Sequence, residues 1–268
     1  MLIATFNVNS IRARIKILER WLNEIKPDLL FMQELKTADE FFPSEIFSQL
    51  GYKSYYHGEK RYNGVGVLIK DGILKENFSI EFGFTSCGSD ELNDSDKNFV
   101  TRVLILRSKN LSVLNTYVPQ GKEINTSEFE IKKIFLSRVK NFLASESIYE
   151  NNFIWLGDMN VAPEPFDVKH PENKKNHVCY CDEIRKIYKD VRGGMVDIFR
   201  KFNQNSDEYT FYDYRYKQAL EKKSGWRIDH ILASPKIMPM FKNCYIDLRP
   251  RTWDKPSDHT PLIAELDI

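Results

Sequence analysis

The chain has 268 residues, a mass of 31.6 kDa and 39 Lys and Arg against 38 Asp and Glu, which leaves a net charge of +1. A hydrophobic fraction of 42% excludes a disordered chain, and the small net charge excludes binding to polyanions through bulk charge. No apolar run approaches the roughly 20 residues of a membrane helix, and the first residues do not resemble an export signal. We therefore expect one cytoplasmic domain, residues 1–268, without membrane attachment.

The N-terminal part predicts a strand–helix–strand unit. An apolar run at residues 3–8 indicates a short buried strand. Apolar residues then recur every three or four positions over 11–25, which predicts an amphipathic helix with Ser10 as its N-cap. A second apolar run at 29–33 ends at Glu34. Strands joined in this way are expected to pair in parallel.

The middle of the chain predicts an antiparallel arrangement of short strands separated by polar turns. These strands are expected at residues 52–56, 64–69, 100–106 and 111–118. The acidic stretch 86–98 is expected to be an exposed loop, with a linker as the alternative. A second long helix carries Phe135 and Val139 on its apolar face, and a buried strand at 153–157 follows it and ends at Asp158.

The C-terminal third predicts two short helices and then further strands. The helices are expected at 182–190 and 195–202, and the strands at 210–214, 227–233, 244–248 and 261–266. Because strands and helices are mixed and no Ser/Gly-rich linker separates them, we expect an α/β fold of two packed mixed sheets flanked by helices.

The four cysteines predict free thiols rather than a bound metal or disulfides. Cys87, Cys179, Cys181 and Cys244 match neither paired zinc-ligand spacing nor a dense disulfide framework. A metal site made from Cys179, Cys181 and the nearby His177 is the alternative. Zinc requires four ligands, so we favour free thiols in a reducing compartment.

Chelating or titratable side chains stand where six predicted strands end. They are Asn7, Glu34, Tyr117, Asp158 with Asn160, Asp229, and Asp258 with His259. A single Asp after a strand is usually a turn former. Three acids, however, converge only where positive charge offsets their repulsion. Their oxygen ligands suit Mg²⁺ or Mn²⁺, and such ions serve phosphoryl-ester hydrolysis.

In their order along the chain, these motifs resemble the exonuclease III family of apurinic/apyrimidinic endonucleases, within the endonuclease/exonuclease/phosphatase superfamily. The motifs are FNVNSIRAR (6–14), PDLLFMQELK (27–36), GYKSYYHGEK (51–60), GVGVL (64–68), YVPQG (117–121), GDMNVAP (157–163), DYR (213–215), WRIDHILAS (226–234) and KPSDHTP (255–261). The resemblance covers essentially the whole chain and implies a DNase I-like four-layer α/β sandwich.

The resemblance implies a role for each residue of the set. Glu34 is implied as the principal ligand of Mg²⁺, or of Mn²⁺. The further metal ligands are Asn7, Asp258, Asp158 and Asn160. The catalytic set is Asp158, His259, Tyr117, Asp229, Asn160 and Asn7. Asp158 activates or positions the attacking water on this reading, and His259, oriented by Asp229, contacts a phosphate oxygen. The formal base stays open, with Asp158 preferred.

The family's usual activity is hydrolysis of the phosphodiester 5′ to an abasic site in duplex DNA, a step of base excision repair. Removal of 3′-terminal nucleotides and 3′-blocking groups accompanies it in related members, and the sequence leaves the balance of these activities open. Phe211, Trp226 and Ile228 are expected to form an apolar pocket for the baseless sugar, with ordinary core packing as the alternative.

Binding to duplex DNA needs cations around the site despite the neutral total charge. The candidates are Arg215, Lys217, Lys60, Arg61 and Lys122. Arg102 alternates with apolar residues and is expected to face away from them. We expect a monomer that associates with the nucleoid through DNA. Two rival functions remain: a phosphoesterase of the same superfamily acting on a lipid or inositol phosphate, and a catalytically silent regulator that binds RNA or protein.

Overall fold

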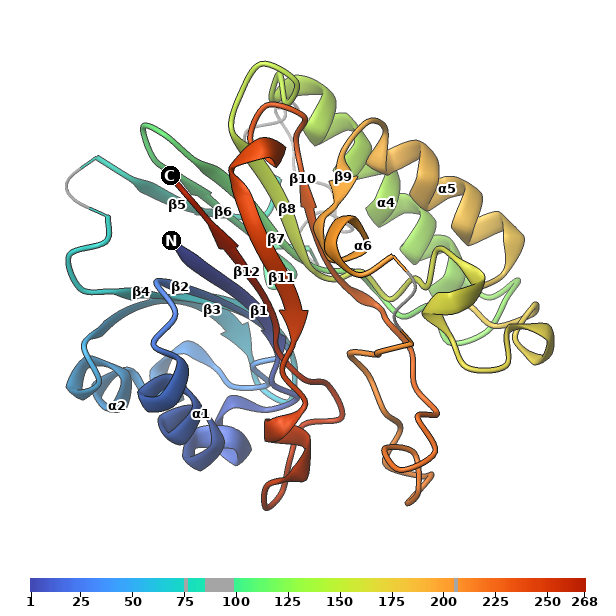
Figure 1. Ribbon diagram of the computed structural model, residues 1–268, viewed down its shortest axis with the longest axis horizontal. Coiled ribbons are helices and arrows are strands. Elements are labelled where there is room, and N and C mark those ends of the chain that lie inside the picture. Colours follow the sequence, from blue (N-terminus) through green and yellow to red (C-terminus); the bar gives the residue numbers. More distant parts are fainter. Residues whose placement is uncertain (75–76, 85–98, 205–206) are drawn as a thin grey trace.

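A computed structural model describes residues 1–74, 77–84, 99–204 and 207–268. Over these residues the strands form two six-stranded sheets (Figure 1). The first sheet has the order β11–β12–β1–β2–β4–β3, with bounds Phe241–Ile246, Leu262–Leu266, Leu2–Asn7, Leu29–Gln33, Tyr62–Lys70 and Tyr52–Glu59. The second has the order β5–β6–β7–β8–β10–β9, with bounds Ser79–Phe82, Val103–Arg107, Ser112–Tyr117, Phe153–Asp158, Asp229–Ala233 and Val196–Asp197.

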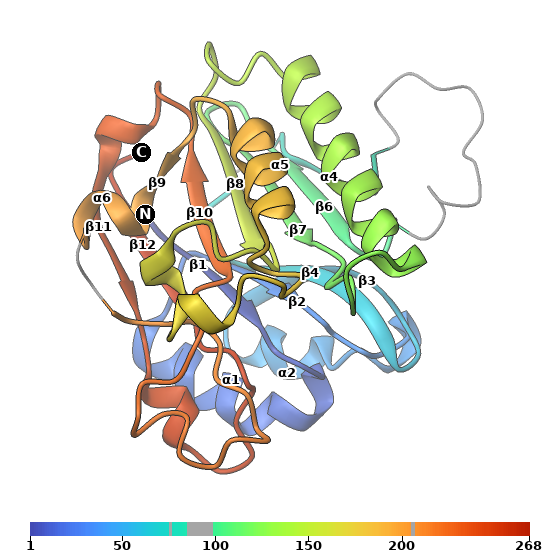
Figure 2. The same ribbon diagram turned by 90° about the vertical axis from the view of Figure 1, so that its right-hand side faces the viewer.

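Helices cover the outer face of each sheet. Helices α1 (Ile11–Ile25) and α2 (Ser44–Gln49) lie against the first sheet, and α4 (Ser127–Ser145) and α5 (Asp182–Arg192) lie against the second (Figures 1 and 2). Helix α6 (Ile198–Phe202) contacts β10 and β11. Short 3₁₀ turns occupy Asp39–Phe41, Pro165–Asp167, Pro171–Asn173, Met238–Met240 and Arg249–Thr252. The predicted four-layer α/β sandwich is confirmed.

Three apolar layers hold these elements together. Between the sheets, strands that the sequence separates widely pack face to face, with Phe31 and Leu156 both fully buried. Trp21 of α1 is buried against the first sheet, and Phe135 of α4 against the second. Because burial of one such side chain contributes about 1.5–3 kcal/mol, each layer fixes the position of the strands whose ends carry polar residues.

Two parallel strand pairs stand among antiparallel neighbours. Strand β1 pairs in parallel with β2, and β7 pairs in parallel with β8, whereas the other pairings between named strands are antiparallel. Each parallel pair is joined by a long helix, as predicted. Parallel strands end at the same edge of a sheet, so Asn7 and Glu34 come together in one sheet, and Tyr117 and Asp158 in the other.

Two of the predicted elements differ from the structure. Residues 210–214 form no strand, because the backbone at Phe211 exchanges hydrogen bonds with Trp226 and makes a bridge to His259, which joins two loops instead of extending a sheet. The helix expected at 195–202 begins only at Ile198. Before it, the chain forms β9 against β10.

Two further expectations concern the start of α1 and the acidic stretch 86–98. Ser10 does not cap α1 through its side chain, because its backbone adopts φ +86° and its N–H donates to the carbonyl of Glu34 at 2.8 Å. The acidic stretch 86–98, which contains Cys87, lies outside the described residues.

Candidate active site

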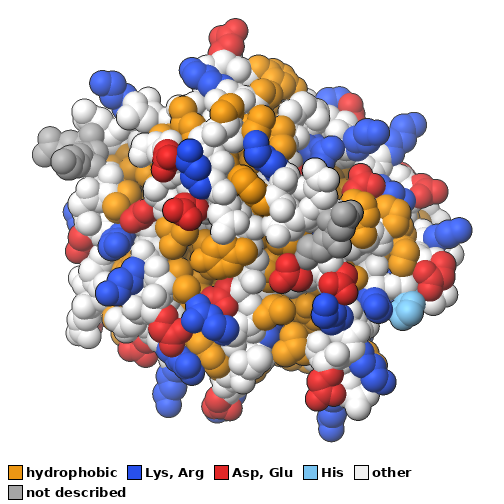
Figure 3. All heavy atoms as spheres, viewed as in Figure 1, with side chains coloured by type: hydrophobic (Ala, Val, Ile, Leu, Met, Phe, Trp, Pro, Cys, Tyr) orange, Lys and Arg blue, Asp and Glu red, His pale blue; other side chains and the backbone are white. Residues whose placement is uncertain are grey.

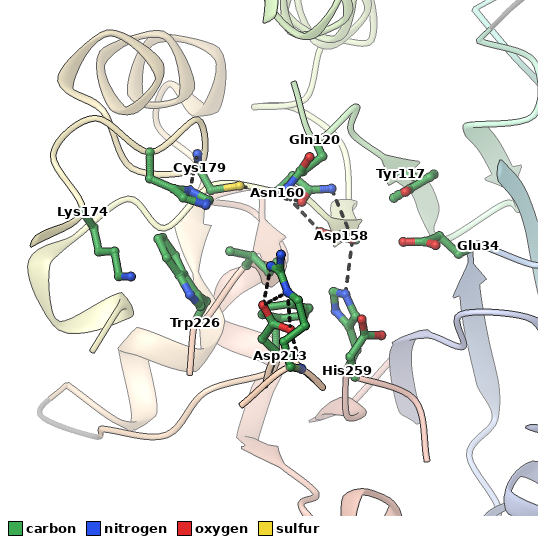
Figure 4. A pocket seen from close by; sticks show the side chains of 15 residues that line it. Glu34, Tyr117, Gln120, Asp158, Asn160, Lys174, Cys179, Asp213, Trp226 and His259 are labelled. Atoms are coloured by element: carbon green, nitrogen blue, oxygen red, sulfur yellow. Dashed lines mark hydrogen bonds and ion pairs between the residues drawn. The ribbon is translucent and has the colours of Figure 1, made fainter. Parts of the chain in front are cut away.

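A cavity of about 510 Å³ opens where the polar ends of the central strands meet. Most of the predicted site residues line it, namely Glu34, Tyr117, Asp158, Asn160, Phe211, Arg215, Trp226, Ile228, Asp258 and His259. Five further residues also line it: Gln120, Lys174 and Asp213, which have no role assigned from the sequence, and His177 and Cys179, which it offered only for an alternative metal site. In Figure 4, Asp158 and His259 lie between Glu34 and Tyr117 on one side and Trp226 and Lys174 on the other.

The amide of Asn7 joins carboxylates from the two sheets. Its Nδ2 donates to Glu34 Oε1 and to Asp158 Oδ2, each at 2.9 Å. Gly157 allows Asp158 to take this place, because β8 approaches β7 so closely that a Cβ at Gly157 would lie 2.1 Å from the carbonyl oxygen of Thr116. Acids that are 124 residues apart in the chain (158 − 34) therefore share one hydrogen-bonding amide.

His259 lies between two further carboxylates. Its Nδ1 is 2.8 Å from Asp229 Oδ2, and its Nε2 is 3.8 Å from Asp158 Oδ2. Burial alone would lower the pKa of His259, but the negative charges of Asp229 and Asp158 raise it to about 10. The imidazole is therefore protonated at neutral pH. This pairing of Asp229 with His259 agrees with the one expected from the sequence.

In Asp158, unlike His259, the effect of burial on the pKa outweighs that of the neighbouring opposite charge. Burial raises its pKa to about 7, even though the imidazolium of His259 pulls it down. The negative charges of Asp229 and Glu34 also contribute to this rise. A carboxyl group with this pKa exchanges a proton near neutral pH, which is the property required of a general base.

Glu34 remains ionised because the positive charge of a lysine stabilises its carboxylate. Burial favours the neutral acid, but the charge and hydrogen bond of Lys36 hold the pKa of Glu34 below its ordinary value. Lys36 Nζ lies 2.6 Å from Glu34 Oε2 and 2.5 Å from Asn9 Oδ1, and Asn9 Nδ2 donates to Asp258 Oδ1 at 2.8 Å. Lys36 was not predicted, although it stands two residues after Glu34 in the ELK motif.

The donor set fits a hard divalent cation. Glu34, Asp158 and His259 each offer one atom, and these three atoms lie within 4.8 Å of one another. The protonated imidazole of His259 cannot ligate a metal, which leaves two carboxylates and the neighbouring amides, an oxygen-rich set typical of Mg²⁺ or Mn²⁺ sites. Asp258 lines the same cavity but does not belong to this three-residue group.

Tyr117 is held from behind by an arginine. Burial and the charge of Glu34 raise its pKa well above the ordinary value, so the phenol stays neutral. Arg102 donates from Nη1 to the carbonyl of Tyr117 at 3.1 Å, and its guanidinium lies 4.5 Å from the centre of the Tyr117 ring. Arg102 thus turns away from its apolar neighbours, as expected, and toward this residue of the cavity.

An aromatic wall closes the far side of the cavity. Trp226 and Phe211 lie there as predicted, with the Phe211 ring 5.0 Å from that of His259. The imidazole of His177 lies 4.5 Å from the Trp226 ring, and Lys174 Nζ 5.7 Å from it. Burial and nearby lysines lower the pKa of His177 to about 4, so this wall is uncharged at His177.

His177 packs against Trp226 in this wall, and it does not belong to the metal-ligating group found among the described residues. The nearby thiols of Cys179 and Cys181 are buried and free, and Cys244 is also free. Among the described residues, the one His/Cys/Asp/Glu cluster with the geometry for a metal is that of Glu34, Asp158 and His259, in which the two carboxylates are the available ligands. In the sequence, only the closeness of His177 to Cys179 and Cys181 singles out this segment.

Of the predicted DNA-contacting cations, Arg215 alone lines the cavity. Arg215 has a side chain 91% exposed and donates to Asp213 Oδ2 at 2.6 Å. Lys217 is exposed on the same loop, Lys60 and Arg61 are exposed at the β3–β4 turn, and Lys122 pairs with the carboxylate of Glu128. Cations and acids are interspersed on the face shown in Figure 3, as the small net charge implies.

Comparison with known proteins identifies the family. A model of the Endonuclease/Exonuclease/phosphatase family matches residues 4–259. The chain belongs to this family. It is 34% identical to exodeoxyribonuclease III of Haemophilus influenzae over 97% of this chain and 98% of that protein. An AP endonuclease from Archaeoglobus fulgidus is 41% identical with a TM-score of 0.90, and 100% of both chains is covered.

A third similar protein was solved with nucleic acid. It is a 3′ phosphatase from Neisseria bound to a product DNA hairpin, 29% identical with a TM-score of 0.88 over 100% of both chains. These relatives confirm the predicted family, a phosphodiester hydrolase and a nuclease of DNA repair. The family is metal-dependent. Among the described residues, no helix combines the length and apolar character needed to cross a bilayer.

Proposed function

We propose that this nuclease hydrolyses the phosphodiester 5′ to an abasic site in duplex DNA, and that it also removes 3′-terminal nucleotides and 3′-blocking groups. One observation carries the proposal. Glu34, Asp158 and His259 bring their functional atoms within 4.8 Å of one another, in a cavity that has an apolar wall beside them. Acids and an imidazolium suit phosphate chemistry, and the wall suits a sugar without a base.

The proposed cofactor is Mg²⁺, with Mn²⁺ as a substitute. Glu34 would hold it, together with Asp158, Asp258 and the amide oxygens of Asn7 and Asn160. When bound, such an ion neutralises charge on the phosphate and polarises its P–O bonds. Lys36 supplies part of that positive charge from the protein itself, since it already contacts Glu34.

The remaining polar groups have separable proposed roles. Asp158, with a pKa of about 7, accepts a proton from the attacking water. The imidazolium of His259, oriented by Asp229, donates a hydrogen bond to a non-bridging phosphate oxygen and stabilises its growing negative charge. Tyr117 donates a hydrogen bond from its neutral phenol to the phosphate. The Asn160 side chain donates to the Val118 carbonyl at 2.9 Å, which holds it at the cavity.

The aromatic wall is proposed to select the flipped abasic residue. Phe211, Trp226 and Ile228 present apolar atoms to it, and His177 narrows the space next to Trp226. Arg215, Lys217, Lys60, Arg61 and Lys122 are proposed to bind the DNA backbone on both sides of the lesion. Cations outside the apolar wall would thus separate attachment to DNA from recognition of damage.

Residues 1–268 are proposed to act as one domain and as a monomer, in the cytoplasm and on the nucleoid. Strand β12 pairs with β1, so that the last strand completes the sheet that the first strand begins. This pairing supports a unit that depends on the whole described chain.

A duplex oligonucleotide with one abasic site tests the proposal. Wild-type protein is expected to cut on the 5′ side of the lesion with Mg²⁺ and to stop when a chelator is added. Glu34→Gln and Asp158→Asn should each reduce incision by roughly 10²–10⁴-fold. Equal cutting by all three proteins would refute the site. Cleavage of sphingomyelin or an inositol phosphate, with the abasic duplex left intact, would refute the substrate.

A further inference from the structure

One lysine of α4 has no exposed surface and no assigned role in the proposed chemistry. Lys132 is 0% exposed, and its ammonium donates to the backbone carbonyls of Gln120 at 3.1 Å, Asn160 at 2.8 Å and Val178 at 2.8 Å. An ammonium has three protons, so these three acceptors satisfy it completely. A buried charge without such partners would be strongly unfavourable.

The three carbonyls belong to three separate segments around the cavity. Gln120 follows β7 and Asn160 follows β8, and both line the cavity. Val178 lies between His177 and Cys179, which also line it. Figure 4 shows Gln120, Asn160 and Cys179 along one side of the pocket. A single buried cation therefore joins the backbone of the phosphate side of the site to the backbone of the aromatic wall.

We propose that Lys132 is a positioning residue that sets the spacing between the phosphate-binding loops and the pocket wall. Loss of its ammonium group would leave three buried carbonyls without their shared donor and free the segments to separate. Catalysis depends on placement so sharply that a shift of about 1 Å is enough to reduce a rate by roughly 10²-fold. The inference rests on the proposed cleavage of abasic DNA for its kinetic test.

The matched comparison is between two neighbouring lysines. Lys132→Met removes the charge and keeps an unbranched side chain, whereas Lys133→Met removes a cation that pairs with Glu130 and Glu183 on the surface. With saturating Mg²⁺, Lys132→Met should lower kcat for abasic incision by about 10–100-fold with KM within about threefold. Lys133→Met should keep both kcat and KM within twofold of the wild-type values. Lys132→Arg, which keeps the positive charge, should recover most of kcat.

A fluorine spectrum separates displacement of the wall from general loss of structure. In protein labelled with 5-fluorotryptophan, the Trp226 resonance, assigned with Trp226→Phe, reports the wall because His177 lies against that ring. Lys132→Met should shift this resonance and leave that of Trp21, which α1 buries against the first sheet, unchanged. If Lys132→Met does not fold, Lys132→Gln, which keeps two donors without charge, replaces it with the same expectations.

Three outcomes would overturn the inference: kcat of Lys132→Met within twofold of wild type, an equal loss of kcat in Lys133→Met, or a Trp21 resonance that moves together with that of Trp226. Failure of the wild-type protein to cut abasic DNA would instead refute the proposed function. The fluorine spectrum would then still decide the role of Lys132.

Discussion

The two strand–helix–strand units, β1–α1–β2 and β7–α4–β8, have the same topology and end in acids of opposite character. Glu34 follows the first unit beside the ammonium of Lys36, which keeps the pKa of Glu34 low. Asp158 ends the second unit in full burial, and its pKa rises to about 7. One backbone plan, used twice, thus presents a permanent anion and a group able to exchange protons. Their neighbours, not the topology, determine which is which.

The largest expected effect separates these two acids by metal titration. In Glu34→Gln, abasic incision should fall and then partly recover as Mg²⁺ rises, with half-maximal activity at a concentration at least tenfold above wild type. In Asp158→Asn, kcat should fall by about 10³-fold and no concentration of Mg²⁺ should restore it, since the lost group accepts a proton. Recovery of both variants, or of neither, would erase the distinction between the two acids.

A smaller effect is expected on stability, through His259 beside Asp158. Because the pKa of His259 is raised to about 10, the folded protein holds a proton that the unfolded chain releases near pH 6.5. The stabilisation is complete below pH 6.5 and is lost as pH rises through 10. Urea unfolding with chelator at pH 7.5 and pH 9.5, a window above the pKa of Asp158, should show a loss of about 2 kcal/mol in wild type. In His259→Asn, the free energy of unfolding should fall less between these two pH values. An equal fall in wild type and His259→Asn would contradict this account.

The smallest expected effect concerns the cation that distinguishes Glu34. Lys36→Met frees one oxygen of Glu34 and removes a positive charge that repels a divalent ion. Since both side chains are partly exposed, we expect the affinity for Mg²⁺, measured calorimetrically, to increase by about three- to tenfold. Lys16→Met, which removes an exposed charge from α1, should bind Mg²⁺ as wild type does. Weaker binding by Lys36→Met would show that Lys36 assists the metal.

Residues at strand ends were predictable because buried strands and the polar groups after them are visible in the sequence. Glu34 and Asp158 follow apolar runs directly, and the structure brings them to one cavity as expected. The role of Lys132 was not predictable, because a lysine on a helix is ordinarily solvated and only the fold brings three carbonyls to it. His177 was noticed only through its cysteine neighbours, since its contact with Trp226 spans 49 residues of chain (226 − 177).

The strand order of the first sheet has a consequence during synthesis. Strand β12 lies between β11 and β1, and His259, three residues before it, completes the set that Asn7 begins. Residues 1–250 contain neither that strand nor that imidazole. During synthesis, closure of the first sheet and assembly of the acid–imidazole set therefore wait for the same segment and occur together.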